Sequence, residues 1–370
     1  LPICRVAARA IQPPAEALER ALAKLRAARR PVIVVGHGAR FDMDGVLALA
    51  ELLKAPVLTT FKGKGLVPDD HPLGCGVLGR SGTPIASWVM NEADLLLVFG
   101  ASFSNHTGIT PKIPTIQVDY DAMALGRFHA VEVPVWGEIA ATAAALTAGL
   151  AGGTDSVDQA PDVAGRWRLW RAEKARREAD DRGLGVNSAA IFASLTRQVP
   201  DDAILAVDVG NNTYSFGRYF ECARQSVLMS GYLGSIGFAL PAALGAWAAT
   251  QEEGPDAQRF RGRKVVSISG DGGFGQYMAE LTTAVKYGMD VTHVLVDNSQ
   301  LGEISKEQRA GQWPVWQTEL VNPDFAAYAE LCGAAGTRVE RAADLDEALA
   351  AALAHRGPAL VHVLADPELI

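Results

Sequence analysis

Apolar residues fall into short unbroken runs that alternate with longer amphipathic stretches. PVIVVGHGA (31–39) and DLLLVFGAS (94–102) each run into a Gly turn, which is typical of strands buried on both faces of a parallel sheet. Segments 14–29 and 44–55 instead carry apolar residues at helical spacing. Because strand and helix alternate along most of the chain, the pattern predicts an α/β fold with two doubly wound parallel sheets.

The same pattern divides the chain into three parts. A central α/β domain is expected at 1–150, with helices at 14–29, 44–55, 83–93 and 135–150, strands at 31–39, 56–60, 94–102 and 115–121, and a Gly- and Pro-rich loop over 61–83. A linker and a charged connector helix (166–181) are expected at 151–185. A second α/β domain is expected at 186–370, with helices at 187–199, 274–288, 322–334 and 344–355 and strands at 203–210, 290–299 and 358–366. Residues 230–250 are expected to form a Gly-rich entry to an apolar helix, and 264–273 a strand followed by a turn.

Composition narrows the function classes. The 370 residues are 49% hydrophobic and 21% charged, with a formal net charge of −8, as in ordinary globular proteins. The short basic run RGRK (261–264) is expected to be a solvated turn, so nucleic-acid binding is disfavoured. No apolar stretch approaches the roughly 20 residues of a membrane span. The cysteines are widely separated, which favours a reducing, cytoplasmic setting over a zinc site or disulfide framework: Cys4, Cys75, Cys222 and Cys332.

Glycines and a single carboxylate follow an apolar strand in SISGDGG. Gly270, Gly272 and Gly273 let a ligand approach the backbone, and a helix that begins here favours a phosphate. Asp271 would repel that phosphate unless it holds a hard cation such as Mg²⁺. Asn298 ends the next predicted strand and can supply a second oxygen, because the carboxyl ends of parallel strands meet at one edge. The alternative is a helix N-cap for the aspartate and a turn residue for the asparagine.

The GDGG sequence, followed at this spacing by Asn298, resembles the cofactor motif of the thiamine diphosphate (ThDP) enzymes. The resemblance implies that Mg²⁺ is bound by the side chains of Asp271 and Asn298 and by the backbone carbonyl of Gln300. It also implies that Gly272 and Gly273 lie against the diphosphate.

The segment SGYLGSIGFALPAALGA (230–246) resembles the part of pyruvate-processing ThDP enzymes that carries the aminopyrimidine ring. The resemblance implies that the Gly234 carbonyl accepts a hydrogen bond from the 4′-amino group. Ile236 would wedge between the two rings of the cofactor and hold it bent. Asp208 and Gly210 end the preceding predicted strand and are placed at the same edge. A Gly-rich start to a core helix is the alternative for this segment.

The segment LGEISKEQRAGQW (301–313) follows the metal motif. By the same resemblance, Ile304 would face the reacting carbon. Glu307 matches a position that carries an active-site Glu in pyruvate oxidases and a Trp in acetolactate synthases. A Glu close to the reacting carbon could relay protons. An exposed helix glutamate is the alternative for Glu307.

Residues 1–150 resemble the central domain of this family. The loop TTFKGKGLVPDDHPLGCGVLGRSGT (59–83) is similar to one that approaches the flavin in acetolactate synthases and pyruvate oxidases, and TIQVDYDAMALG (115–126) to the strand and turn near the FAD adenosine. FGASFSNHTG (99–108) lacks the Arg-Phe-Asp of acetolactate synthases, and no GxGxxG occurs. FAD is therefore a possible third cofactor besides ThDP and Mg²⁺.

The resemblance implies an enzyme that decarboxylates a 2-keto acid, with pyruvate as the expected substrate. The enamine would pass electrons to flavin, as in pyruvate oxidases, or attack a second carbonyl, as in acetolactate synthases, and Glu307 favours the oxidase. A non-oxidative 2-keto acid decarboxylase is an alternative, and a non-catalytic nucleotide-binding module is an alternative of another class. A P-loop phosphotransferase would need a GxxxxGK[ST] that the sequence lacks.

The chain starts with Leu1-Pro2, where the N-terminal pyrimidine-binding domain of the family would end. That domain supplies the glutamate that activates the cofactor, from a neighbouring subunit. We therefore expect the 370 residues to be the C-terminal part of a longer enzyme, active as a homodimer or homotetramer.

Overall fold

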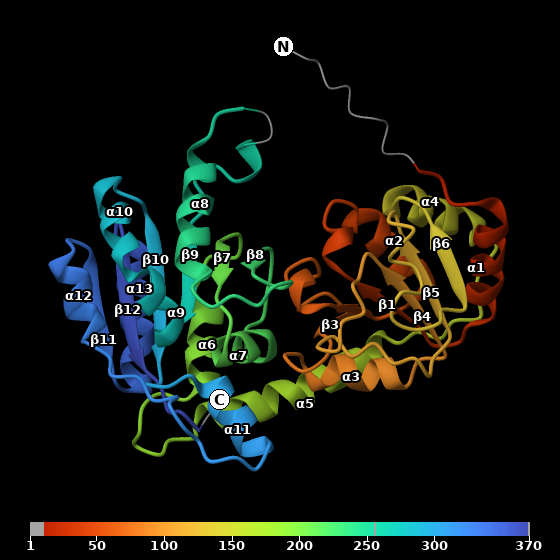
Figure 1. Cartoon of the computed structure of the whole chain (residues 1–370). Coiled ribbons are helices and arrows are strands. Elements are labelled where there is room, and N and C mark those ends of the chain that lie inside the picture. Colours follow the sequence, from red (N-terminus) through yellow and green to blue (C-terminus); the bar gives the residue numbers. More distant parts are fainter. Residues whose placement is uncertain (1–10, 255–256, 369–370) are drawn as a thin grey trace. The chain divides into compact units, whose positions relative to one another are not determined.

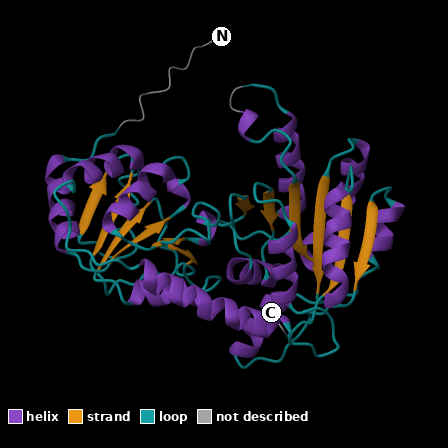
Figure 2. Ribbon diagram, turned by 180° about the vertical axis from the view of Figure 1, so that it is seen from behind, coloured by secondary structure: helices purple, strands orange, loops and turns teal. Residues whose placement is uncertain are grey.

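A computed structural model describes residues 11–254 and 257–368, so the expectations for Leu1-Pro2 and Cys4 lie outside the described residues. The chain divides into two compact units, Leu1–Trp170 and Arg171–Ile370. Each unit contains a six-stranded, fully parallel sheet with helices packed against it (Figure 1 and Figure 2). The predicted fold class is confirmed.

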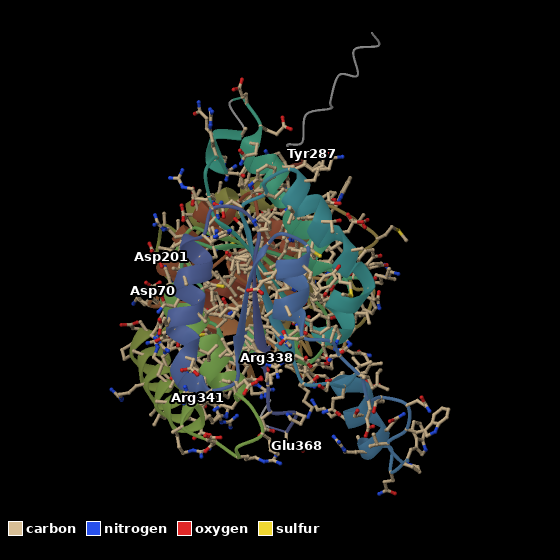
Figure 3. All side chains as sticks on the ribbon, turned by 90° about the vertical axis from the view of Figure 1, so that its left-hand side faces the viewer. Asp70, Asp201, Tyr287, Arg338, Arg341 and Glu368 are labelled. Atoms are coloured by element: carbon tan, nitrogen blue, oxygen red, sulfur yellow. The ribbon has the colours of Figure 1, made fainter. Side chains whose placement is uncertain are left out.

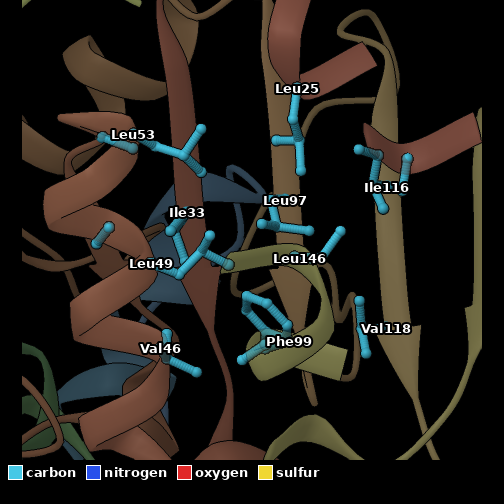
Figure 4. Close-up of a cluster of buried hydrophobic side chains, with 14 of the residues drawn as sticks. Leu25, Ile33, Val46, Leu49, Leu53, Leu97, Phe99, Ile116, Val118 and Leu146 are labelled. Atoms are coloured by element: carbon cyan, nitrogen blue, oxygen red, sulfur yellow. The ribbon is translucent and has the colours of Figure 1, made fainter. Parts of the chain in front are cut away.

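The first unit has its long apolar strands in the middle of the sheet. In spatial order the strands are β3 (Gly74–Val77), β2 (Val57–Thr59), β1 (Pro31–Val35), β4 (Leu95–Phe99), β5 (Thr115–Asp119) and β6 (Val133–Trp136). Its helices are α1 (Ala15–Ala27), η1 (His37–Ala39), α2 (Met43–Leu53), η2 (Phe61–Gly63), α3 (Pro84–Asn91), α4 (Ile139–Gly149) and the first part of α5 (Ala160–Glu178). One face of the sheet contributes Ile33, Leu97 and Phe99 to a core that Leu49 of α2 and Leu146 of α4 complete (Figure 4).

The second unit repeats this arrangement with a different strand order. In spatial order its strands are β11 (Ala335–Val339), β12 (Ala359–Leu364), β10 (Val291–Asp297), β9 (Val265–Gly270), β7 (Ile204–Val207) and β8 (Ser226–Met229). Its helices are α6 (Ser188–Gln198), α7 (Asn211–Tyr219), α8 (Ala239–Gln251), η3 (Ala257–Arg259), α9 (Asp271–Tyr277), η4 (Met278–Glu280), α10 (Leu281–Lys286), α11 (Gly302–Ala310), α12 (Phe325–Leu331), η5 (Ala342–Asp344) and α13 (Leu345–Ala354). Every residue of β10 is buried, including the polar Thr292, His293 and Asp297 that stand among its Val and Leu residues.

Several expected elements differ from the structure. The loop expected over 61–83 contains η2 and the strand β3, and the helix expected at 135–150 begins only at Ile139, after β6. The single helix expected at 274–288 is interrupted by the 3₁₀ turn η4. The edge strands β8 and β11 and the helix α7 have no counterpart in the prediction. No residue of β8 is fully buried, so this strand lacks the apolar run by which a strand is found.

Exposed charged side chains lie on the second unit, among them Arg338 and Arg341 (Figure 3). In the basic run 261–264, Arg261 is exposed in a turn as predicted, whereas Arg263 donates to the carbonyl of Ala203 and Lys264 pairs with Asp290. In the stretches 11–254 and 257–368, no helix combines the length and the apolar character that a membrane crossing requires.

Candidate functional site

The register of the second sheet brings the predicted metal ligands to neighbouring strand ends. Gly270 of β9 pairs with Val296 of β10, so Asp271 and Asn298 follow at the same edge. On the other side of β9 lies β7, from which the chain runs outward to β8 before it returns to β9. Ligands of open α/β sheets bind at the carboxyl ends of the strands where the order reverses in this way. The predicted residues therefore lie where this topology favours a ligand.

Asp271 is buried at the first position of α9. Its Oδ2 atom accepts a hydrogen bond of 2.7 Å from Nδ2 of Asn322. Burial and, next, the charge of Asp297 raise the pKa of Asp271 to about 7. The N-cap of α9 is Gly270 and makes no side-chain capping bond, so the alternative interpretation of Asp271 as a helix cap is wrong.

Asp297 is the second carboxylate of the site, and sequence reasoning did not select it. Burial alone would raise its pKa, but hydrogen bonds from His362 Nε2 (2.9 Å), the Ser299 N–H (2.8 Å) and Asn322 Nδ2 (2.8 Å) lower the pKa to about 2. Asp297 is thus readily ionised, whereas its buried neighbour Asp271 resists ionisation. A divalent cation next to Asp271 would remove that resistance, so the acid pair fits the predicted Mg²⁺.

The turn after β10 offers neutral oxygens. Asn298 Oδ1 accepts from the N–H of Gln300 at 3.3 Å, and Ser299 takes the left-handed conformation with φ of 54°. The Gln300 carbonyl accepts from the Gly302 N–H at 2.9 Å and keeps a second lone pair. A carboxylate, an amide oxygen and a carbonyl make a set of hard donors suited to Mg²⁺. The described residues contain no group of three or more His, Cys, Asp or Glu side chains arranged to hold a metal ion, whereas the predicted ligand set contains only one such side chain, Asp271.

Asn211 is a candidate that sequence reasoning missed. It begins α7 directly after Gly210, whose φ of 127° requires glycine. Both polar atoms of its side chain are buried and have no hydrogen-bond partner among the described residues. A Cβ on Gly302 would lie 2.1 Å from Asn211 Nδ2 and 3.0 Å from Asn298 Nδ2, so this glycine leaves room for two amides. An orphaned buried amide at a ligand edge indicates a polar ligand. The signal was available in the sequence as the Asn that follows a strand-end Gly.

Asp208 connects β7 to the loop that precedes α8. Its Oδ2 accepts from the Gly237 N–H at 3.1 Å, and its Oδ1 from the N–H groups of Val209 (2.7 Å) and Phe238 (3.3 Å). A Cβ on Gly273 would lie 2.6 Å from Asp208 Oδ2. The Asp208 carboxylate therefore leaves no room for a side chain at position 273, although the sequence motif assigns Gly273 to the diphosphate. Gly272 is similarly enclosed, since a Cβ there would lie 2.8 Å from Leu301 Cδ2.

The predicted aminopyrimidine segment lies in the loop between β8 and α8. Gly234 is exposed with φ of 68°, and a Cβ there would meet nothing within 4 Å. Ile236 is half-buried. Gly237 has φ of 85°, and a Cβ there would lie 2.7 Å from the Tyr277 ring. The bond from Gly237 to Asp208 brings this loop to the ligand edge, whereas no hydrogen bond within the described part of the chain joins Gly234 to the metal motif.

Ile304 and Glu307 lie on α11 with their side chains exposed. Their spacing of three residues places them on one face of the helix. Ser305 is buried between them and donates to Thr318 Oγ1 at 2.8 Å. The structure thus places Ile304 and Glu307 shortly after the Asn298–Gln300 turn, here called the metal turn, and their roles stay predictions.

In the first unit, the sheet order reverses between β1 and β4. At this edge the Gly36 and Gly38 backbones contact Gly100 closely: a Cβ on Gly36 would lie 2.1 Å from the Gly100 carbonyl oxygen. These glycines meet a packing requirement of the protein itself. In the segment predicted to lie near FAD adenosine, Gln117 holds the turn by accepting from the Gly126 N–H at 2.8 Å.

Comparison with known proteins identifies the class. Residues 208–363 match the C-terminal TPP binding domain of thiamine pyrophosphate enzymes, and residues 18–146 match their central domain. The chain therefore belongs to the thiamine pyrophosphate (that is, ThDP) enzyme family, and the resemblance drawn from the sequence is confirmed.

Individual relatives refine this picture. The chain is 32% identical to a putative thiamine pyrophosphate-containing protein, YdaP, of Bacillus subtilis, with 97% of the chain and 60% of the relative aligned. It is 30% identical to a probable acetolactate synthase large subunit of Methanocaldococcus jannaschii (95% and 60%) and 32% identical to a sulfoacetaldehyde acetyltransferase of Rhodobacter capsulatus (96% and 65%). The chain thus spans about 60% of the length of these curated relatives.

Proposed function

We propose that the chain binds ThDP and Mg²⁺ at the carboxyl edge of its second sheet and decarboxylates a 2-keto acid, pyruvate in the first instance. The observation that carries this proposal is the buried Asp271, next to a second carboxylate and to the Asn298–Gln300 turn, in a domain of the ThDP enzyme family. An uncompensated pair of buried carboxyls is unfavourable unless a proton or cation accompanies it.

Different residues of the second unit would bind the cation, the diphosphate and the aminopyrimidine. Asp271, the Asn298 side chain and the Gln300 carbonyl would hold Mg²⁺, and the Asn211 amide would bind a diphosphate oxygen. Gly234 would accept from the aminopyrimidine, with Ile236 under the ring junction. When bound, ThDP supplies a thiazolium ring that accepts the electron pair left by decarboxylation.

Two fates of the carbon fragment left after decarboxylation are supported by different observations: oxidation, and transfer to a second substrate. Glu307, exposed on α11, favours a pyruvate oxidase-like enzyme, in which FAD would serve as the electron acceptor and Glu307 would move a proton. The relatives named as acetolactate synthases and a sulfoacetaldehyde acetyltransferase favour transfer to a second substrate. A non-oxidative decarboxylase is the third form of the same proposal. We further propose that a pyrimidine-binding domain outside these residues completes the site in a homodimer or homotetramer.

A titration tests the proposal. ThDP is added to the purified protein with and without Mg²⁺ and followed by isothermal calorimetry. We expect saturable binding that requires Mg²⁺ and that Asp271→Asn removes, because the amide leaves the cation without its only side-chain charge. The visible spectrum of the same sample reports flavin, and product analysis with pyruvate separates oxidase, synthase and decarboxylase.

Two results would contradict parts of this proposal. No Mg²⁺-dependent ThDP binding, also when a pyrimidine-binding domain of a relative is supplied, would overturn it as a whole. Binding of ThDP without a flavin band would remove the oxidase-like form and leave the other two.

A further inference from the structure

The segment between α11 and α12 lies against the predicted metal turn. The N–H of Leu301 donates to the carbonyl of Thr318 at 2.8 Å, and the N–H of Leu320 donates to the carbonyl of Ser299 at 2.9 Å. Gln300 and Glu319 form an antiparallel bridge between these bonds. Residues 318–324, here called the bracing segment, therefore fix the backbone that carries the Gln300 carbonyl.

The bracing segment also reaches the acid pair through one side chain. Asn322 Nδ2 donates to Asp271 Oδ2 at 2.7 Å and to Asp297 Oδ1 at 2.8 Å. Ionised carboxylates only accept hydrogen bonds, so the partners identify the amide nitrogen as the atom that faces them. A side-chain amide is neutral and carries two hydrogens on one nitrogen, one for each acid. Serine would offer one hydrogen and alanine none.

Asp297 is itself held from both sides. Its Oδ2 lies 2.9 Å from His362 Nε2, and its Oδ1 accepts from the Ser299 N–H at 2.8 Å. The hydrogen bonds thus run from β12 through Asp297 to the metal turn, and from Asp297 through Asn322 to Asp271. Hydrogen bonds from groups that are not predicted to touch the cation therefore fix both the Asp271 carboxylate on α9 and the turn after β10.

We propose that Asn322 is a positioning residue, which orients the Asp271 carboxylate toward a divalent cation while the bracing segment keeps the Asn298–Gln300 turn beside it. The inference rests on the proposed function. Asn322 donates to one oxygen of the Asp271 carboxylate, and the cation would bind this carboxylate in the orientation that the hydrogen bond fixes. Outer groups of this kind commonly contribute 10- to 100-fold to metal affinity.

Manganese binding tests this role without an activity assay. Mn²⁺ is titrated into the protein with saturating ThDP, and free Mn²⁺ is counted by electron paramagnetic resonance. We expect Asn322→Ala to weaken Mn²⁺ binding by about 10- to 100-fold, and Asn322→Ser, which keeps one donor, to weaken it less. The hyperfine pattern of the bound ion should broaden in the same order, because the ligand field becomes less fixed.

Asn187 supplies the matched control. It also uses Nδ2 for two hydrogen bonds, to the carbonyls of Glu178 and Asp180, and its Oδ1 caps α6 through the Ala190 N–H at 2.7 Å. Asn187→Ala should lower thermal stability and leave Mn²⁺ affinity unchanged.

The outcomes separate the two proposals. Mn²⁺ affinity of Asn322→Ala and Asn322→Ser equal to that of the wild type would overturn the positioning role and leave the proposed function standing. Loss of affinity in Asn187→Ala equal to that in the Asn322 variants would also overturn it, because the effect would then be one of general stability. A wild type that binds neither ThDP nor Mn²⁺ would overturn the proposed function and this inference together.

Discussion

At the scale of single residues, Gly273 shows that the packing of the protein itself can require a glycine in a ligand-binding motif. Asp208 accepts three backbone N–H groups and lies 2.6 Å from where a Gly273 Cβ would stand. Burial raises the pKa of Asp208, and these N–H bonds oppose the rise. A methyl group at 273 would push against a carboxylate that the loop before α8 already holds.

Gly273→Ala should therefore destabilise the ligand-free protein by about 1–3 kcal/mol, since overpacked buried positions cost this much. Gly275→Ala, on the same helix, is the control, because a Cβ there meets nothing within 4 Å. Urea unfolding in the absence of ThDP and Mg²⁺ measures both variants. Equal stability of the two variants would contradict the clash, and Gly273→Ala should cost less stability in an Asp208→Ala background than in the wild type.

The candidate site was predictable from sequence only where its residues follow strand ends. Asp271 and Asn298 follow apolar runs, so the rule for parallel sheets places them together. Asn322 is 51 residues from Asp271 in the chain and lies in a segment without periodicity, and nothing local in its sequence marks it. Its role depends on backbone pairing between the bracing segment and the metal turn, which a single sequence does not reveal.

At the scale of elements, the strands found from the sequence are those buried on both faces. β9 and β10 are buried over all or nearly all of their length, whereas the edge strands β8 and β11 have few or no fully buried residues. An edge strand needs only backbone pairing on one side, so its sequence resembles that of a loop. The same reasoning explains the missed α7, which carries Asn, Thr and Ser through its first turns.

His293 joins the two central strands of the second sheet. Its ring nitrogens lie 2.8 Å from Ser267 Oγ and 3.0 Å from Ser269 Oγ, and it packs against Phe274. Burial lowers the pKa of His293 from 6.5 to about 3. Between these values the unfolded chain binds a proton that the folded chain excludes, so stability falls as the pH falls through 6.5.

From pH 7 to pH 4.5, the wild type should lose roughly 2–3 kcal/mol more stability than His293→Gln, by the free energy of two pKa units. Denaturant unfolding at a series of pH values measures the difference. His355→Gln, a change at an exposed histidine, should follow the wild type. A pH profile of His293→Gln parallel to that of the wild type would exclude this histidine as the source of the acid sensitivity.

The loop between β2 and β3 contains a buried ion pair. Lys64 Nζ lies 3.3 Å from Asp69 Oδ2, and the side chains are only 2% and 4% exposed. Lys64→Met should destabilise the protein by about 3–5 kcal/mol, because it removes the ammonium group that faces the buried Asp69 carboxylate, and Lys64→Met with Asp69→Leu by less. The control is Arg341→Ala in the surface pair with Asp344, which should have little effect. Thermal and urea unfolding measure all three, and a double variant less stable than Lys64→Met would contradict the argument.

At the scale of the whole molecule, each unit has a sheet and a hydrophobic core of its own. All predicted ThDP and Mg²⁺ ligands belong to the second unit. A ligand that binds only folded protein stabilises the part it binds, by about 2.7 kcal/mol at 100 times its Kd.

Calorimetric unfolding should therefore show two transitions, of which only one moves to higher temperature when ThDP and Mg²⁺ are added together. Asp271→Asn should cancel that shift and leave the other transition where it was. A single transition would show that the units unfold as one, and two transitions that move equally would contradict a ligand site confined to the second unit.

The neighbour of Asn322 along the chain has a consequence for how the site ages. Asparagines commonly lose their amide when the backbone nitrogen of the next residue attacks the side chain, and such a reaction would turn the donor between two acids into a third acid. The next residue is Pro323, which has no N–H to begin that attack. Asn298 precedes Ser299, whose N–H is engaged with Asp297. Two amides of the site are thus shielded from the same slow chemistry by different means.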